Sequence, residues 1–293
     1  MFIATAINGN RAPEERKVPR DEYPAAAERK FAKYFGPKRR TLAPYVSKSR
    51  CKQIVRLLVV VLCALALKYF YSTASVNELR WILAPTTQLV ELISGERFQF
   101  EPYAGYINRS HTFVIAASCA GLNFLLTAFL MLALRQLWRQ RSPTVSWSFL
   151  PVTAALAYVA TIITNTVRIT TALQLRELHV QSSWLSAGQI HRLEGIFVYF
   201  GFLLLLYVLT ERLSQRGLDV LPISGGRPRQ SLVFPLVIYY GTTLGIPLLN
   251  GSFRQAEFWE HSVFVLLAPL VLIIPLVTVR NLWRRRAPVR IPN

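Results

Sequence analysis

The chain has 293 residues, of which 52% are hydrophobic, and it carries a formal net charge of +19. Its apolar residues form blocks too long for an ordinary soluble domain, which favours a membrane protein. The basic residues fall in short runs between these blocks, so the charge indicates membrane topology and no nucleic-acid partner. Three scattered cysteines exclude a disulfide framework.

The sequence predicts three parts. Residues 1–52 are rich in charged residues, Pro and Ala without hydrophobic periodicity, so we expect a basic, mostly disordered cytoplasmic tail. Residues 53–213 are expected to form a membrane core of four spans, and residues 214–293 a C-terminal extension of two spans. The six apolar segments that predict these spans are 54–71, 112–134, 147–167, 196–210, 231–250 and 262–279.

Basic residues predict the orientation of the spans. Six crossings that begin inside leave 25 of the 34 Lys and Arg residues on the cytoplasmic side and 7 on the opposite side. This bias places both termini in the cytoplasm. Residues 77–94 have apolar positions at helical spacing interrupted by charges, which indicates an amphipathic or re-entrant helix on the outer face. The expected fold is therefore an all-α, polytopic transmembrane bundle of about six spans plus this outer helix.

Cys119 is expected about seven residues into the second span, ~10 Å below its outer end. Its small neighbours, Ser118, Ala120 and Gly121, leave space for another backbone to approach the sulfur. A cysteine in an apolar helix is more often a small hydrophobic residue than a nucleophile, and Cys63 in the first span is interpreted in that way. Cys119 becomes a candidate nucleophile only together with other residues.

Two such residues are expected at the same face of the membrane. Arg168 ends the third span and shares a helical face with Asn165. An arginine there either reaches lipid headgroups or stabilises a thiolate and a negatively charged oxygen. His191 begins the fourth helix, with Glu194 and Gly195 one turn further on. A loop histidine is usually only solvated, but a histidine beside a cysteine activates the thiol.

Several enzyme classes lack their motifs. The sequence contains no His-Glu-x-x-His, no Gly-x-Ser-x-Gly and no Gly-x-x-x-x-Gly-Lys, so zinc peptidase, serine hydrolase and P-loop ATPase functions have no support. No Asp or Glu lies between Glu101 and Glu177, which argues against an intramembrane aspartyl protease and a proton-coupled transporter. We expect neither a metal nor another cofactor.

Three motifs occur in order on successive predicted helices: Ser118-Cys119-Ala120-Gly121-x-Asn123-Phe124, Asn165-x-x-Arg168-Ile169 and His191-x-x-x-Gly195. This set resembles the exosortase/archaeosortase family of membrane-embedded cysteine transpeptidases, over about residues 82 to 213. Many members carry Ser where this chain has Ala120, a form associated with the exosortase K-like branch. The last two spans and the basic tail lie outside the similar stretch.

The resemblance implies that residues 53–213 are a catalytic core in the bacterial inner membrane, with Cys119, Arg168 and His191 at its outer, periplasmic face. The substrate would be a membrane-anchored protein whose C-terminus has a short motif, a transmembrane helix and a basic cluster. Cleavage through a Cys119 thioester would transfer the product to an envelope acceptor or to water. The supporting residues would be Asn165, Gly121, Glu194 and Gly195. The residues alone also allow a non-enzymatic transporter or assembly scaffold in which Arg168 binds an anionic lipid or solute.

Overall fold

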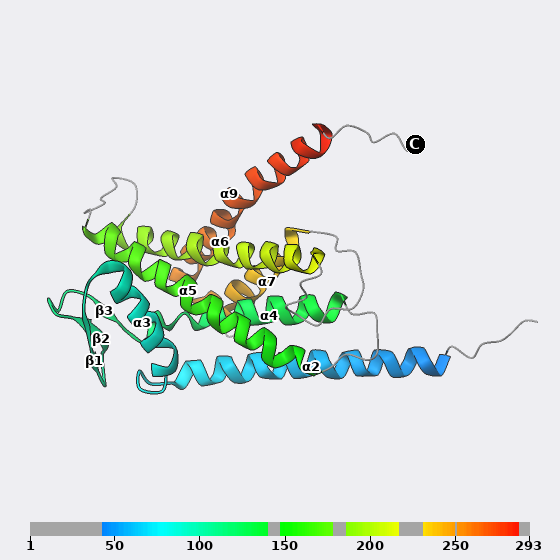
Figure 1. Cartoon of the computed structure of the whole chain (residues 1–293), viewed down its shortest axis with the longest axis horizontal. Helices are drawn as coiled ribbons and strands as arrows, with labels where there is room; N and C mark the ends of the chain where they lie inside the picture. The colour runs from blue at the N-terminus through cyan, green and yellow to red at the C-terminus, as the bar shows by residue number, and fades with distance from the viewer. Residues whose placement is uncertain (1–42, 140–146, 178–185, 217–230, 250, 287–293) are drawn as a thin grey trace, which may run out of the picture. The chain divides into compact units, whose positions relative to one another are not determined.

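The computed structural model describes residues 43–139, 147–177, 186–216, 231–249 and 251–286, and most of them are helical (Figure 1). Five helical segments among the described residues are long and apolar enough to cross a membrane: Cys51–Thr73, Ala117–Trp138, Phe149–Arg176, Gly188–Gln215 and Phe258–Thr278. The prediction of a multi-pass helical membrane protein is confirmed at this level. The number of six crossings and the side on which each loop lies stay predictions.

The helices that carry these five segments are longer than the apolar blocks suggest. Their bounds are Ala43–Thr73 (α2), Leu122–Arg139 (α4), Phe149–Glu177 (α5), Ala187–Gln215 (α6) and Ala256–Arg286 (α9). α2 begins inside the expected cytoplasmic tail, whose first 42 residues lie outside the described residues. The division at residues 52 and 213 stays a prediction.

The fifth expected span, 231–250, is not one long helix. It consists of α7 (Val233–Tyr240), a π-helical segment η2 (Gly241–Gly245) and α8 (Ile246–Leu249). Pro247 has no N–H to donate to the preceding turn, and glycines at both ends of η2 weaken the α-helical pattern, so the chain adopts a π-helical turn there. The apolar stretch Val233–Leu249 is shorter than the five candidate spans.

The predicted amphipathic helix is present as α3 (Arg80–Ser94). One face buries Ile82, Leu83 and Val90, whereas Leu92 and Ile93 remain exposed. The helix ends at Gly95, whose left-handed φ of 74° allows its N–H to bond to the carbonyl oxygen of Glu91. Its position on the outer face of a membrane stays a prediction.

The expectation of an all-α fold is wrong for the segment after α3. An antiparallel sheet follows, with strands β1 (Phe98–Glu101), β2 (Gly105–Asn108) and β3 (Val114–Ile115) in the order β1-β2-β3. Phe98 and Phe100 alternate with polar residues, a period-2 pattern that suits a strand better than a helix. The sheet leads the chain directly to the segment that carries Cys119.

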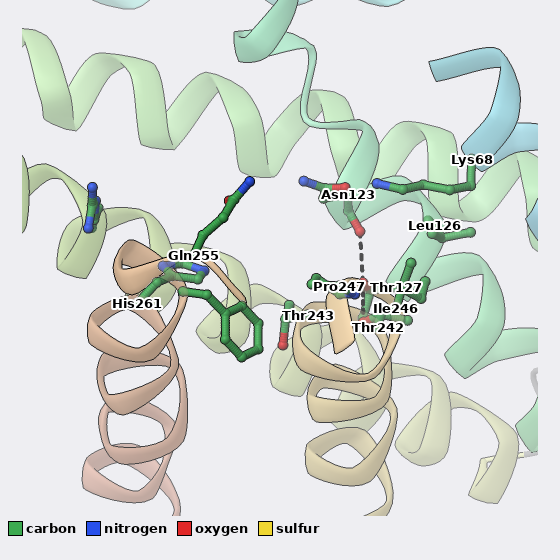
Figure 2. Close-up of a pocket in the computed structure, with 12 residues that line it drawn as sticks. Lys68, Asn123, Leu126, Thr127, Thr242, Thr243, Ile246, Pro247, Gln255 and His261 are labelled. Atoms are coloured by element: carbon green, nitrogen blue, oxygen red, sulfur yellow. Dashed lines mark hydrogen bonds between the residues drawn. The ribbon is translucent and has the colours of Figure 1, made fainter. Parts of the chain in front are cut away.

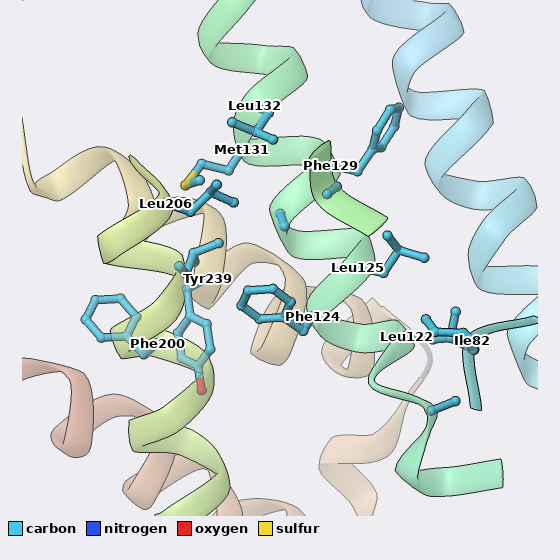
Figure 3. Packing of buried hydrophobic residues seen from close by; sticks show 14 of the residues in the cluster. Ile82, Leu122, Phe124, Leu125, Phe129, Met131, Leu132, Phe200, Leu206 and Tyr239 are labelled. Carbon is cyan, nitrogen blue, oxygen red and sulfur yellow. The ribbon is translucent and has the colours of Figure 1, made fainter. Parts of the chain in front are cut away.

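α4 is the central helix of the bundle. In its most apolar stretch 67% of residues are buried, against 17% in α2, so α4 is enclosed by protein while α2 is mostly left to lipid. Figure 3 shows Phe124 and Met131 of α4 beside side chains from α6 and α7, while Leu125 lies on the other side of α4. Since lipid is as apolar as these residues, close packing rather than exclusion of water holds the helices together.

Two contacts fix the register of α4 against α6. Near one end the rings of Phe124 and Tyr199 lie with centroids 5.5 Å apart, and near the other end Arg135 Nη2 lies 2.5 Å from Glu211 Oε2. The two helices therefore run parallel, with α5 returning between them along the sequence. The predicted second span ends at residue 134, which would leave Arg135 in a cytoplasmic loop, but Arg135 lies within α4 and is buried.

Candidate functional site

The three residues predicted to be catalytic lie at one end of the bundle, on different elements. A 3₁₀ turn, η1 (Ala117–Ala120), carries Cys119, while α5 carries Arg168 and α6 carries His191. The amino ends of α4 and α6 meet the carboxyl half of α5 at this end, because the helices alternate in direction.

Cys119 does not lie two turns inside the second span, as the sequence suggested. It lies in η1, and α4 begins only at Leu122. The apolar run was counted from residue 112, but Val114 and Ile115 form β3 and the candidate span starts at Ala117. Cys119 is thus close to the end of its span and next to the amino end of α4, which attracts negative charge.

Gly121 and Asn165 hold η1 against α5. Gly121 has a left-handed φ of 71°, and a Cβ atom there would lie 3.0 Å from Cγ of Asn165, so the position suits only glycine. The Asn165 side-chain amide donates to the carbonyl oxygen of Cys119. Its other atom, Oδ1, accepts from the hydroxyl of Tyr199 at 3.2 Å. Asn165 is fully buried and positions the backbone of the candidate nucleophile.

Arg168 joins α5 to α6. Its Nη1 donates to the Tyr199 hydroxyl at 3.2 Å, and its Nη2 lies 3.4 Å from Nε2 of His191. A Cβ atom at Gly195 would lie 3.3 Å from Nε of Arg168, so the glycine leaves room for the guanidinium. The sequence placed Arg168 at the end of its span, but α5 continues to Glu177, and the side chain therefore lies inside the bundle.

His191 lies in the second turn of α6, close to the helix start that the sequence predicted. The helix begins with a capping box in which Ser186 and Gln189 exchange side-chain to backbone hydrogen bonds. The His191 side chain is 54% exposed, and its Nδ1 lies 3.5 Å from Oε2 of Glu194, which is 6% exposed. Neither buried carboxylate oxygen of Glu194 has a hydrogen-bond partner among the described residues, so Glu194 lies beside the imidazole without a hydrogen bond to it.

A cavity of about 260 Å³ connects these groups, and its walls include Ser118, Gly121, Arg168, His191, Gly195 and Tyr199. Cys119 lies between two of the lining residues. Cys119 itself does not line the cavity, but its carbonyl oxygen accepts from Asn165, which in turn accepts from Tyr199 in the cavity wall. The cavity therefore brings a guanidinium and an imidazole together beside the turn that carries Cys119.

Two tyrosines in this cavity were not singled out from the sequence as site residues. Tyr199 follows His191 and Gly195 at helical intervals of four, so this periodicity could have placed it on the same face. Tyr71 looks like an ordinary aromatic residue at the end of a span, and only its contact with the cavity distinguishes it. Of the other histidines, His261 also lines the cavity, His111 is exposed in the loop before β3, and His179 lies outside the described residues.

No family model, curated protein or solved structure matches this chain. The resemblance to the exosortase/archaeosortase family therefore stays a prediction from the three motifs. The function has to be inferred from the residues of the site and their geometry.

Proposed function

We propose that this chain is a membrane-embedded cysteine transpeptidase of the exosortase type, which cleaves C-terminal sorting signals of secreted proteins at the outer face of the bacterial inner membrane. The position of Arg168 is the observation that supports this proposal. Its guanidinium contacts Tyr199 and His191, and Tyr199 in turn donates to Asn165, whose amide holds the carbonyl oxygen of Cys119. A guanidinium held in this way stabilises negative charge that develops beside the sulfur.

In the proposed reaction, Sγ of Cys119 attacks the carbonyl carbon of the scissile peptide, and the carbonyl electron pair moves onto oxygen. Arg168 donates to that oxygen. His191 takes the thiol proton and gives it to the leaving amine as the C–N bond breaks, which leaves a thioester on Cys119. An amine or hydroxyl of an envelope component, or water, then attacks the thioester. The attacking group loses its proton to His191, and the sulfur leaves as a thiol.

Glu194 and Asn165 have supporting roles in this proposal. Glu194 faces Nδ1 of His191 and holds the imidazole with Nε2 toward the reacting groups. Asn165 holds the Cys119 backbone through its carbonyl oxygen. Neither residue needs to touch the substrate, so both act as positioning residues.

A second cavity supports access of a substrate helix from the lipid. Its volume is about 470 Å³, and its apolar walls include Cys63, Leu67, Trp81, Phe129, Ala155 and Tyr158. These residues come from α2, α3, α4 and α5. Because α2 is mostly unburied, a transmembrane helix can approach between α2 and α5, where the small alanine side chain allows close contact. Such a helix would bring the peptide beyond its end to η1.

Thiol labelling tests the site without knowledge of the substrate. A variant with Cys51→Ser and Cys63→Ser keeps only Cys119, and intact cells are treated with a membrane-impermeant maleimide. We expect pH-dependent labelling from outside that Arg168→Ala weakens. The matched control keeps only Cys63, an exposed residue of α2 in the apolar part of its span, and should label poorly. An inert Cys119, or one labelled only from the cytoplasm, would favour the transporter or scaffold.

Trapping of the thioester tests the reaction itself. In native cells, mass spectrometry should detect a peptide on Cys119 that neutral hydroxylamine releases. Cys119→Ala and Arg168→Ala should both abolish the adduct while the protein still inserts, and Cys63→Ala should leave it unchanged. A hydroxylamine-sensitive adduct that persists in Cys119→Ala would contradict the proposed nucleophile. The sequence of the released peptide would identify the sorting motif.

A further inference from the structure

A cavity of about 420 Å³ lies beside the candidate site, between α2, α4, α6, the η2–α8 segment and α9 (Figure 2). It shares five lining residues with the cavity of the candidate site, among them Asn123, Arg192 and His261, so the two spaces adjoin. The catalytic proposal uses none of these three side chains. The π-helical segment of the C-terminal extension forms one wall, which gives that extension a place beside the candidate site.

Basic side chains from three helices line this cavity. Lys68 comes from α2, Arg192 from α6 and His261 from α9, and no Asp or Glu is among the described residues that line it. In Figure 2, Lys68 extends toward Asn123 on one side, while Gln255 and His261 lie on the other. The ammonium of Lys68 is also 5.2 Å from the ring centroid of Tyr71, which keeps the side chain within the bundle.

The positive charge of this cavity is only partly neutralised. The nearest acidic partner of Arg192 is Glu260, whose Oε1 lies 3.8 Å from Nη1 and also accepts from Gln189 at 3.0 Å. Across the described ranges of the chain, no carboxylate forms an ion pair with Lys68. At least one full positive charge therefore faces a half-enclosed space without a protein counter-ion. Such an arrangement is costly in a membrane protein unless a ligand uses the charge.

The remaining polar groups favour an anion with several acceptor oxygens. The amides of Asn123 and Gln255 can donate into the cavity together with Lys68 and Arg192. The hydroxyls at the wall are already engaged, since Thr127 and Thr242 bond to each other at 2.9 Å and Thr243 donates to the Tyr239 carbonyl oxygen at 2.6 Å. The threonines thus hold the wall in place, and the nitrogen donors are left for the ligand.

We propose that this cavity binds a phosphate group, carried either by an anionic lipid headgroup or by a soluble phosphate. Lysine supplies a point charge and arginine a planar pair of donors, a combination that suits phosphate oxygens. The cavity lies at the end of the apolar helices, the level at which lipid headgroups are found. The proposal does not depend on the catalytic function of Cys119.

Native mass spectrometry of the full-length protein in detergent tests this site with phosphatidic acid as the probe and phosphatidylcholine as the comparison lipid. We expect preferential retention of phosphatidic acid. Lys68→Gln and Arg192→Gln should each weaken it about tenfold, the effect of one lost charge-assisted hydrogen bond. Lys68→Arg should retain the lipid, which shows that a loss in Lys68→Gln is one of charge and not of folding.

The matched control is Arg254→Gln, which removes an exposed cation next to Gln255 that does not line the cavity. It should bind phosphatidic acid like the unmodified protein, and so should Cys119→Ala. Competition with inorganic phosphate distinguishes the two sources of the phosphate group. If inorganic phosphate displaces phosphatidic acid, the site binds a soluble phosphate; if phosphatidic acid stays bound, the site binds a lipid headgroup. Equal retention of both lipids, or equal losses in Lys68→Gln and Arg254→Gln, would overturn the proposal.

Discussion

Nη2 of Arg168 lies 3.4 Å from Nε2 of His191, and this contact determines which form of the imidazole the site holds. A guanidinium has donors and no acceptor, so Nε2 must accept and the ring proton must lie on Nδ1, facing Glu194. In the proposed mechanism, the basic nitrogen is therefore covered by Arg168 until a substrate binds. A substrate oxygen that takes over the Arg168 donor would release His191 at the moment when a proton acceptor is needed.

Replacement of Tyr199 by phenylalanine tests this arrangement. The change removes the acceptor of Arg168 Nη1 and the donor to Asn165, so the guanidinium and the Cys119 backbone both lose a fixed partner. We expect thioester formation to slow about tenfold, with a loss of about 1–2 kcal/mol in the free energy of unfolding. The control is Tyr240→Phe, which removes a 2.7 Å bond to the Leu266 carbonyl oxygen and lines neither the site cavity nor the cavity proposed for substrate access. Equal slowing in both variants would contradict a role for Tyr199.

Gly195→Ala separates the function of the site from the stability of the helix. The new methyl group would lie 3.3 Å from Nε of Arg168 and displace the guanidinium by a few tenths of an ångström. Alanine in place of glycine inside α6 should otherwise favour the helix by up to about 1 kcal/mol. We therefore expect unchanged or higher thermal stability together with thioester formation about tenfold slower. Gly188→Ala, in the same helix with nothing within 4 Å, should be silent in the activity assay.

The helices and the motif order could be predicted from the sequence because both depend on nearby residues. His191 and Gly195 share a face of α6 by spacing alone, and Tyr199 continues it. The start of α4 could not be predicted in this way, because the apolar run continues without interruption from β3 into α4. Hydropathy therefore gives no sign that the helix begins only after Gly121. That break depends on Asn165, a contact between residues far apart in the sequence.

Long-range partners explain the other differences between sequence and structure. Arg135 looks like a cytoplasmic charge because hydropathy treats each residue separately, but its partner Glu211 lies on another helix. The strands after α3 are short, and their pairing depends on a turn rather than on a long alternating pattern. The π-helical segment η2 could not be predicted either, because it lies inside an apolar block whose composition is that of an ordinary membrane span.

Glu78 gives a pH-dependent prediction for the turn between α2 and α3, outside the candidate spans. Its carboxylate accepts from the N–H of Ser75 at 2.7 Å and from the Ser75 hydroxyl at 2.8 Å, which lowers the pKa of Glu78 below its ordinary value of 4.5. Because the pKa of Glu78 is lower in the folded than in the unfolded state, its carboxylate stabilises the fold at pH values above the ordinary pKa. This stabilisation is lost as the pH falls through the lowered, folded-state pKa. The thermal midpoint should therefore fall more steeply on acidification in the unmodified protein than in Glu78→Gln. Glu101→Gln, another exposed carboxylate at this end, should follow the unmodified protein.

Gly121 and Gly95 form a matched pair for measuring how tightly η1 is held against α5. Both have left-handed φ angles, 71° and 74°, so alanine at either position incurs a conformational cost of about 1–2 kcal/mol. Only at Gly121 would the new Cβ also meet Asn165, at 3.0 Å, whereas Gly95 has nothing within 4 Å.

Unfolding titrations should therefore show a larger loss for Gly121→Ala than for Gly95→Ala, by about 1–3 kcal/mol, the usual cost of overpacking. Labelling of Cys119 should change only in Gly121→Ala, because displacement of Asn165 releases the Cys119 carbonyl oxygen. If both variants lost equal stability and kept the same labelling rate, the contact between η1 and α5 would not position the thiol. In that case the Asn165 bond could not be the feature that brings Cys119 into the range of Arg168.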